Sequence, residues 1–275
     1  MLDGNKKEME ETKEQDKVEI SMEEIEGHTI SPVAQVAPKE QSQSRLARVG
    51  RRFKSTAFMR FMVWLIKRVM LILWPTKIFF KERFNIEGRA IVTCNHYGSF
   101  DTNPIINAFY KKKPVSILLK KELMEKDDFK ARFLDEIGGI PVNRHQADIT
   151  AIKRALKALN SDQQLIIYPE GTRNRKDTKQ MGKIEEGTAM FAIKAKAPIV
   201  PLMYYRCTKW YRKNYLLVGH PFTLEEFYDD KSPDVKKKAT AKIVDEYAKL
   251  RKEIDEIVEV YKGSEKKYKK AHGIK

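Results

Sequence analysis

The sequence contains few cysteines and no metal-ligand spacing. Cys94 and Cys207 are the two cysteines among 275 residues. They are too few for a disulfide framework and suit a reducing cytosol. The chain shows no His-x-x-x-His and no Cys-x-x-Cys pair, so the sequence points to no metal site. We therefore expect a chemistry that uses neither a metal ion nor a bound cofactor.

The sequence also lacks an uninterrupted apolar run near the roughly 18–20 residues that span a bilayer. Its most apolar stretch, residues 58–75, is broken by Arg60, Lys67 and Arg68. Arg60 and Lys67 share one helix face, with Trp64 between them. We expect one or two amphipathic helices lying in a membrane interface, where Trp is favoured and basic side chains reach lipid phosphates. A core helix of a soluble domain and a spanning helix are the alternatives.

Aromatic side chains are missing from the first 40 residues, which also show no sustained apolar period. Five basic and eleven acidic residues give this tail a charge of −6; the whole chain carries +16, so the remainder carries +22. We expect the tail to be disordered, either as a solvated extension or as an acidic shield over the basic body. Residues 41–54 contain five Lys or Arg and no acid. A basic body indicates an anionic partner, whether nucleic acid, anionic lipid or a phosphorylated substrate.

Short apolar strands alternate with helical segments from residue 90 onward. This alternation predicts an α/β fold with a mixed, largely parallel sheet flanked by helices. Residues 84–88 are expected to form a strand and turn that enter the fold, and residues 262–275 are expected to fray. The expected strands are 90–94, 115–119, 140–142, 164–168, 199–205 and 215–219, and the expected helices are 102–110, 121–136, 147–159, 184–195 and 234–262.

A polar loop follows the predicted strand 90–94 and brackets His96 and Asp101 between a strand and a helix start. Gly98 lets this loop bend back, so the imidazole and the carboxylate could meet. A carboxylate on one ring nitrogen would leave the other free to deprotonate a substrate alcohol, as in a hydrolase triad whose serine is supplied by the substrate. Taken alone, the pair is better explained by local hydrogen bonds, because the spacing is common by chance.

A second motif follows the predicted strand 164–168, where the chain reads Glu170-Gly171-Thr172-Arg173. A tight turn at a strand end presents backbone N–H groups together with the Arg173 guanidinium, which suits a phosphate monoester. Glu170 is either part of a site or a structural acid that holds the loop. Thr172 would bind the loop or the phosphate.

The two motifs and two further segments, residues 138–144 and 197–202, resemble in their order the glycerolipid acyltransferase family, specifically its 1-acyl-sn-glycerol-3-phosphate acyltransferases. The resemblance covers about residues 80–220. It implies a peripheral or monotopic membrane protein, which we expect at the cytoplasmic face. The expected organisation is a disordered acidic tail, membrane-associating helices, a catalytic domain, and a charged C-terminal helix with a basic tail, over residues 1–40, 41–80, 81–230 and 231–275.

The resemblance also implies that Arg173 and Arg144 bind the glycerol phosphate. Lys120 and Lys121, after the predicted strand 115–119, are further candidates, although each basic residue alone is also explained as a solvated surface charge. Cys94 precedes His96 by two residues, so an acyl-enzyme on its thiol is conceivable. A small buried apolar residue is the better interpretation of Cys94, because it lies within the apolar run.

One segment departs from the family pattern. The family often shows Gly-Lys-aromatic-Lys-Lys-Gly after the Glu-Gly-Thr-Arg motif, whereas residues 182–187 read Gly-Lys-Ile-Glu-Glu-Gly. Two acids therefore replace two bases at a place where a donor phosphate might otherwise pass. This puts donor contacts from the segment in doubt.

We expect an enzyme in which His96 deprotonates the sn-2 hydroxyl of 1-acyl-sn-glycerol 3-phosphate and Asp101 orients His96. The hydroxyl oxygen would attack acyl-CoA or acyl-ACP (the acyl carrier protein thioester) directly and give phosphatidic acid. Acylation of glycerol 3-phosphate or of another lysophospholipid is the alternative within the family. A non-catalytic basic protein that binds anionic membranes is the alternative of another class. Nucleic acid is not an expected partner, because no recognised binding motif is present. The oligomeric state stays open.

Overall fold

Short, nearly continuous apolar strands that are buried on both faces build the centre of the fold, a single mixed sheet. The computed structural model describes residues 57–110, 115–125, 128–143, 148–174 and 179–274; the expected acidic tail and the basic residues 45–54 lie outside them. Within these ranges, the sheet has the order β1-β7-β6-β2-β5-β3-β4. Its strands are β1 (Thr76–Phe79), β2 (Ala90–Cys94), β3 (Val115–Lys120), β4 (Gly139–Val142), β5 (Gln164–Ile167), β6 (Ile199–Tyr204) and β7 (Asn214–Val218).

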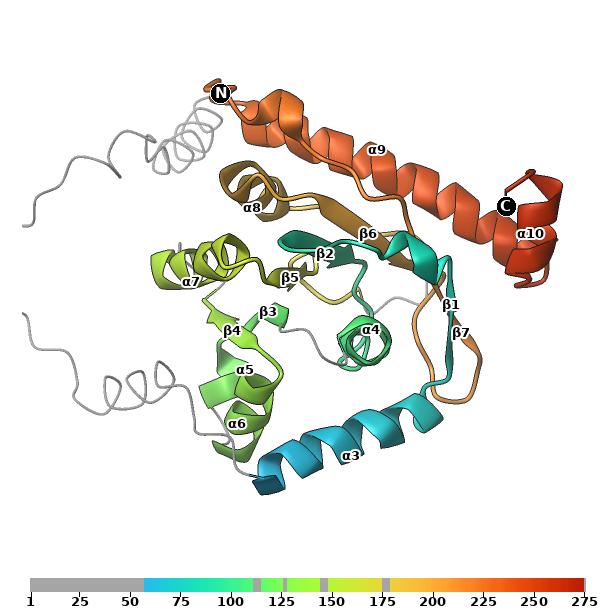
Figure 1. Cartoon of the computed structure of the whole chain (residues 1–275), viewed down its shortest axis with the longest axis horizontal. Coiled ribbons are helices and arrows are strands. Elements are labelled where there is room, and N and C mark those ends of the chain that lie inside the picture. The colour runs from blue at the N-terminus through green and yellow to red at the C-terminus, as the bar shows by residue number, and fades with distance from the viewer. Residues whose placement is uncertain (1–56, 111–114, 126–127, 144–147, 175–178, 275) are drawn as a thin grey trace, which may run out of the picture. The chain divides into compact units, whose positions relative to one another are not determined.

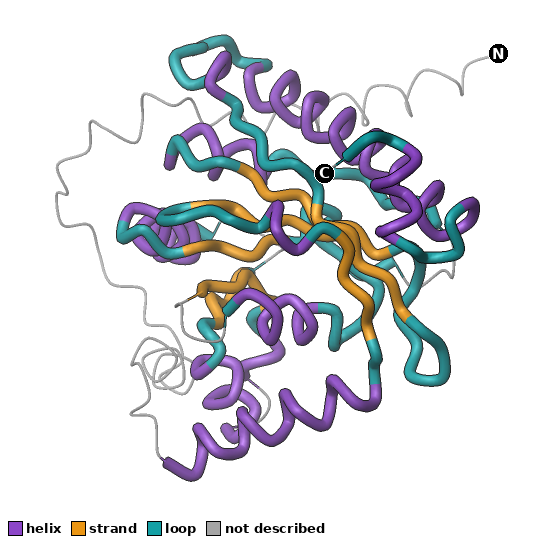
Figure 2. Tube along the Cα trace, turned by 45° about the vertical axis from the view of Figure 1, so that its right-hand side comes forward, coloured by secondary structure: helices purple, strands orange, loops and turns teal. Residues whose placement is uncertain are grey.

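Five neighbouring strands, from β6 to β4, run parallel to one another, as the alternation of strands and helices predicts. β7 pairs antiparallel with β6, and β1 pairs parallel with β7, so the two strands at one end of the sheet run the other way. This arrangement confirms the mixed, largely parallel sheet. Figure 2 shows the strands as one twisted layer with helices on both faces.

Two apolar cores cover the two faces of the sheet, because successive strand residues point to opposite faces. In β2, Ile91 belongs to one core, whereas Val92 and Cys94 belong to the other. The first core is closed by α7, α8 and α9, and the second by α4 (Figure 1). The helices are α3 (Ala57–Leu73), α4 (Thr102–Phe109), α5 (Glu122–Glu125), α6 (Asp128–Glu136), α7 (Ile149–Asn160), α8 (Gly187–Ala195), α9 (Val235–Asp255) and α10 (Glu265–Ala271).

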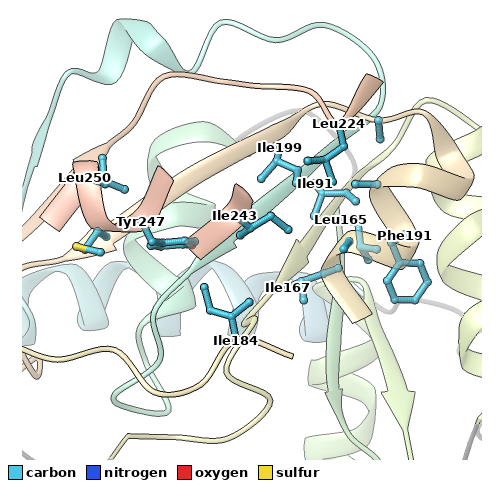
Figure 3. Packing of buried hydrophobic residues seen from close by; sticks show 14 of the residues in the cluster. Ile91, Leu165, Ile167, Ile184, Phe191, Ile199, Leu224, Ile243, Tyr247 and Leu250 are labelled. Atoms are coloured by element: carbon cyan, nitrogen blue, oxygen red, sulfur yellow. The ribbon is translucent and has the colours of Figure 1, made fainter. Parts of the chain in front are cut away.

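β1 belongs to the same sheet as the later strands, and the long helix α9 packs into one of the two cores of that sheet. α9 buries one side of itself on the sheet, and Figure 3 shows Ile243, Tyr247 and Leu250 among strand residues such as Ile91. At the other end of the chain, α3 contacts α4 and α6 and leads through Pro75 into β1.

Two expected elements within the sheet and its flanking helices differ from the structure. The predicted helix 121–136 is two helices, α5 and α6, which contact each other, so the chain changes direction between them. The predicted strand at 84–88 is absent from these described residues. The strand lies earlier, at β1, where β7 offers a pairing edge. Phe84 instead stacks on Phe109 of α4, with ring centroids 4.0 Å apart.

We expected the C-terminal residues to fray, but they form regular structure. α9 gives way to a π-helical turn, Glu256–Val260, and α10 follows. The Ser264 hydroxyl accepts a hydrogen bond from the backbone N–H of Lys267, which caps the start of α10. Tyr268 is buried, and its ring meets Phe80 edge-on with centroids 5.9 Å apart. A cap and one apolar anchor therefore hold a segment whose lysine-rich composition suggested disorder.

Neighbouring residues on α9 provide a matched test of this packing. Ile243 is fully buried, whereas Val244 is 45% exposed. We expect Ile243→Ala to lower the free energy of unfolding by about 2–5 kcal/mol through lost burial and a cavity. Val244→Ala should change the free energy of unfolding by less than about 0.5 kcal/mol. Chemical denaturation followed by circular dichroism measures both, and equal losses would show that α9 does not pack on the sheet as described.

Candidate active site

The candidate site lies where three neighbouring parallel strands end. β2 lies between β5 and β6, and the polar loops after all three strands start at the same edge of the sheet. In open α/β sheets, the crevice outside the carboxyl ends of the strands is the usual place for a ligand. His96 follows β2, Glu170 follows β5, and Thr208 follows β6.

The loop after β2 brings His96 and Asp101 together, as its glycine allows. His96 Nδ1 and Asp101 Oδ2 are 3.1 Å apart. The Asp101 side chain is fully buried at the start of α4, and the His96 side chain retains 12% of its exposure. The imidazole is therefore accessible while the carboxylate behind it is sealed from solvent.

Three further donors fix the Asp101 carboxylate. The backbone N–H groups of Tyr97 and Gly98 donate to Oδ2 at 2.6 and 2.7 Å, and the Thr208 hydroxyl donates to Oδ1 at 2.9 Å. A buried carboxylate with this many donors is satisfied in its ionised form. In the tautomer in which Nδ1–H donates a hydrogen bond to this carboxylate, the lone pair of the ring lies on Nε2. General-base chemistry at Nε2 is what such a contact can support, because a buried carboxylate stabilises an imidazolium beside it.

Tyr168 fixes the plane of the His96 ring from the other side. The two rings stack with centroids 4.0 Å apart and planes 22° from parallel. The Tyr168 hydroxyl and the Thr102 hydroxyl are 2.5 Å apart, which ties β5 to the first residue of α4. Burial raises the pKa of Tyr168 well above its ordinary value, so the phenol stays protonated as a neutral packing surface.

Glu170 connects three segments through its buried carboxylate. Oε1 accepts from the backbone N–H of His96 at 2.8 Å, and Oε2 accepts from the backbone N–H of Gly182 at 2.7 Å. On the other side of His96, its carbonyl accepts from the backbone N–H of Asn174 at 2.7 Å. Burial raises the pKa of the Glu170 carboxyl, and the two N–H donors oppose that rise. Glu170 thus acts here as a structural acid that holds the loops together, and the structure assigns it no proton transfer.

Gly182 is the residue in the departing segment that the site depends on. A β-carbon at this position would lie 2.7 Å from Glu170 Oε2, closer than real contacts allow. In the rest of the segment, Ile184 is buried in the core and Glu186 precedes α8, whereas the Glu185 backbone N–H donates to the Pro169 carbonyl at 2.8 Å, beside the Gly171 turn. The Lys183 side chain is exposed and lies 3.9 Å from Glu185.

The basic candidates differ in what the structure shows of them. Gly171 has φ +64°, so the turn after Glu170 uses a conformation that favours glycine, and Thr172 and Arg173 project from it exposed. Lys120 lies on β3, two strands from β2 or roughly 10 Å across the sheet, and pairs with Glu122 at 3.1 Å. Arg144 lies outside the described residues.

Three site residues were not found from the sequence: Thr208, Tyr168 and Asn95. Asn95 is buried, and its side chain accepts from the Tyr204 N–H at 2.8 Å and donates to the Tyr204 carbonyl at 3.0 Å. This amide bridge joins β2 to β6 at the edge where the site begins. Cys94 is fully buried, and burial raises the pKa of its thiol, which fits an apolar packing role. Among the described residues, no group of three or more His, Cys, Asp or Glu side chains could hold a metal ion.

Comparisons with known proteins match this part of the chain. The family model described as Acyltransferase matches residues 76–205. A 1-acyl-sn-glycerol-3-phosphate acyltransferase of Bacillus subtilis is 28% identical over 141 residues, which cover 50% of this chain and 67% of that protein. The enzyme of the same name from Streptococcus pneumoniae is 33% identical over 122 residues, or 44% of this chain and 43% of that protein.

A solved structure shares the fold. The crystal structure of the 1-acyl-sn-glycerophosphate acyltransferase of Thermotoga maritima matches with a TM-score of 0.53 and 17% identity, over 80% of this chain and 89% of that one. At this identity the likeness concerns the fold alone. It agrees with the mixed sheet and flanking helices described above.

A glycine pair tests the close approach at Glu170. Gly182→Ala should displace the Glu170 carboxylate and lower the free energy of unfolding by about 1–3 kcal/mol, because buried hydrogen bonds are lost. Gly187→Ala is the matched control, since nothing lies within 4 Å of a β-carbon there. It should be neutral or stabilising by up to about 1 kcal/mol at the start of α8. Thermal and denaturant unfolding measure both, and a harmless Gly182→Ala would contradict the described contact.

Proposed function

Because the chain belongs to the acyltransferase family, we propose that it transfers a fatty acyl group from an acyl thioester to the sn-2 hydroxyl of 1-acyl-sn-glycerol 3-phosphate. The names of the relatives support this acceptor, and the matched region spans two thirds of one relative and under half of another. The observation that carries the mechanism is the contact between His96 and a fully buried Asp101 that three other donors hold in place.

In the proposed reaction, His96 Nε2 takes the proton of the sn-2 hydroxyl as its oxygen attacks the thioester carbonyl. The Asp101 carboxylate stabilises the imidazolium that forms. The tetrahedral intermediate then collapses with loss of the thiolate, which takes the proton from His96. No covalent enzyme intermediate is needed, and the donor is acyl-CoA or acyl-ACP.

Arg173 is our proposed ligand for the phosphate of the acceptor. Its side chain is exposed and forms no hydrogen bond or ion pair with the described residues. The next residue is Asn174, whose backbone N–H donates a hydrogen bond to the His96 carbonyl. Arg173 is therefore attached to the loop that holds the proposed base. A phosphate bound near His96 would hold the sn-2 hydroxyl of the acceptor in position for proton removal. Arg144 and Lys120 remain further candidates, and Lys120 would first have to leave Glu122.

We also propose that α3 lies in the interface of a membrane, at its cytoplasmic face. α3 buries Met59 and Val63 but leaves a second set of large apolar side chains exposed, namely Phe58, Phe61, Trp64, Leu65, Val69, Ile72 and Leu73. A helix that is apolar on its outer side as well indicates an apolar environment there. Among the described residues, no helix has the length and apolarity to cross a bilayer.

An acyl-transfer assay tests the mechanism. The full chain in detergent or liposomes would receive lysophosphatidic acid with palmitoyl-CoA or palmitoyl-ACP. We expect His96→Ala and Asp101→Asn each to lower kcat by about 10²–10⁴-fold, because general-base catalysis is lost. His220→Ala, at an exposed histidine, should leave kcat unchanged.

Wild-type turnover by His96→Ala would rule out this mechanism. If glycerol 3-phosphate or another lysophospholipid gives product and lysophosphatidic acid gives none, the proposed acceptor is wrong and the proposed role of His96 stands. A folded wild-type chain that is inactive with every donor and acceptor would favour the membrane-binding protein without catalysis.

A separate kinetic test addresses Arg173. We expect Arg173→Ala to raise KM for lysophosphatidic acid by roughly 10–100-fold, as loss of a charge-assisted phosphate contact should. Arg173→Lys should recover part of that loss. Lys237→Ala, at an exposed lysine of α9, is the charge-matched control. An unchanged KM in Arg173→Ala would remove this residue from phosphate binding.

A further inference from the structure

The connection from β6 to β7 presents two large aromatic side chains to the outside. Residues 209–213 read Lys-Trp-Tyr-Arg-Lys. Trp210 is 65% exposed and Tyr211 is 64% exposed, and their rings meet edge-on with centroids 5.7 Å apart. Single exposed apolar residues are ordinary on protein surfaces. An adjacent Trp and Tyr, flanked by bases and packed mainly on each other, form the side-chain combination found at membrane–water interfaces.

The hydrogen bonds of this loop show that the exposure is built into its structure. The Lys209 backbone N–H donates to Asn214 Oδ1 at 2.9 Å, and Asn214 Nδ2 donates back to the Lys209 carbonyl at 3.0 Å. The Arg212 guanidinium donates to the Cys207 carbonyl. One buried asparagine thus closes residues 209–213 into a ring, and the two aromatic side chains project from a fixed base.

Both ends of the loop are bonded to functional parts of the molecule. On one side, Thr208 donates to the buried carboxylate of Asp101. On the other side, the Asn214 backbone N–H donates to the Pro75 carbonyl at 3.0 Å, just after α3 (Figure 1). Trp74, next to Pro75, contacts Phe100 of the His96–Asp101 loop, with ring centroids 5.0 Å apart. The loop therefore connects the candidate active site to the end of α3.

We propose that residues 209–213 are a second membrane-binding element, in which Trp210 and Tyr211 enter the headgroup region of an anionic bilayer. Lys209 and Lys213 would bind the lipid phosphates beside them, since basic side chains next to interfacial aromatics complement an anionic surface. This inference rests on the proposed membrane location of α3. It places the rim of the site next to Asp101 at the lipid surface, so a lysolipid acceptor need not leave the bilayer to reach His96.

Single-tryptophan fluorescence on the full chain tests this contact. The chain has three tryptophans, so Trp64→Phe with Trp74→Phe leaves Trp210 as the reporter. With vesicles of phosphatidylcholine and phosphatidylglycerol, we expect a blue shift of Trp210 emission and quenching by brominated acyl chains. The control variant also carries Trp210→Phe and Val244→Trp, which moves the reporter to an exposed position on α9. This helix covers the face of the sheet opposite to the one that α4 covers. That reporter should stay unquenched.

Vesicle partitioning of three further variants separates the aromatic contribution from the basic one. Trp210→Ser with Tyr211→Ser should lower the partition coefficient by about tenfold or more on all vesicles. Lys209→Gln and Lys213→Gln should each lower it by about fivefold, on vesicles that contain phosphatidylglycerol. Matching unfolding midpoints would show that each variant keeps its fold.

The outcomes distinguish this inference from the proposal it rests on. Vesicle binding with an unquenched Trp210 would overturn the role of the loop and leave the proposed location of α3 intact. The proposed membrane role of the loop is also overturned if Trp210→Ser with Tyr211→Ser leaves the partition coefficient unchanged. If the wild-type chain binds neither neutral nor anionic vesicles, the membrane location of α3 fails and the loop fails with it.

Discussion

The candidate site depends on how the loop after β5 holds the backbone of His96. The Glu170 carboxylate accepts a hydrogen bond from the His96 N–H, and the His96 carbonyl accepts one from the Asn174 N–H. One loop therefore holds both backbone polar groups of His96. The same carboxylate reaches Gly182, which lacks the β-carbon that would block it. Because these bonds join loops at the carboxyl ends of neighbouring parallel strands, the sheet positions His96 and the Gly171 turn as one unit.

These contacts bring the two motifs together although they lie about seventy residues apart in the chain. Asp101 contacts Nδ1 of His96, Tyr168 stacks on its ring, and Glu170 holds its backbone N–H. With two contacts on the imidazole and one on the backbone of the same residue, His96 has little conformational freedom left to lose when a substrate binds. Arg173 follows in the same loop and is exposed, which is compatible with the phosphate contact that we propose.

The sequence predicted those parts of the site that are local in the chain. His96 and Asp101 are five residues apart around a glycine, and the mixed, largely parallel sheet follows from the alternation of strands and helices. Thr208 was missed because it lies 107 residues from Asp101, and a lone threonine in a loop carries no pattern. Asn95 and Tyr168 were missed for the same reason. α10 was misjudged because one cap and one buried tyrosine outweigh a lysine-rich composition.

The most direct measurement of the His96–Asp101 interaction is ¹⁵N NMR of the imidazole nitrogens in the full chain. The chain contains five histidines, and the His96→Gln variant assigns the signals. At neutral pH we predict that His96 carries its proton on Nδ1 and has an unprotonated Nε2, and that Asp101→Asn abolishes this preference. A proton fixed on Nε2 in the wild-type chain would contradict the role of His96 as the base.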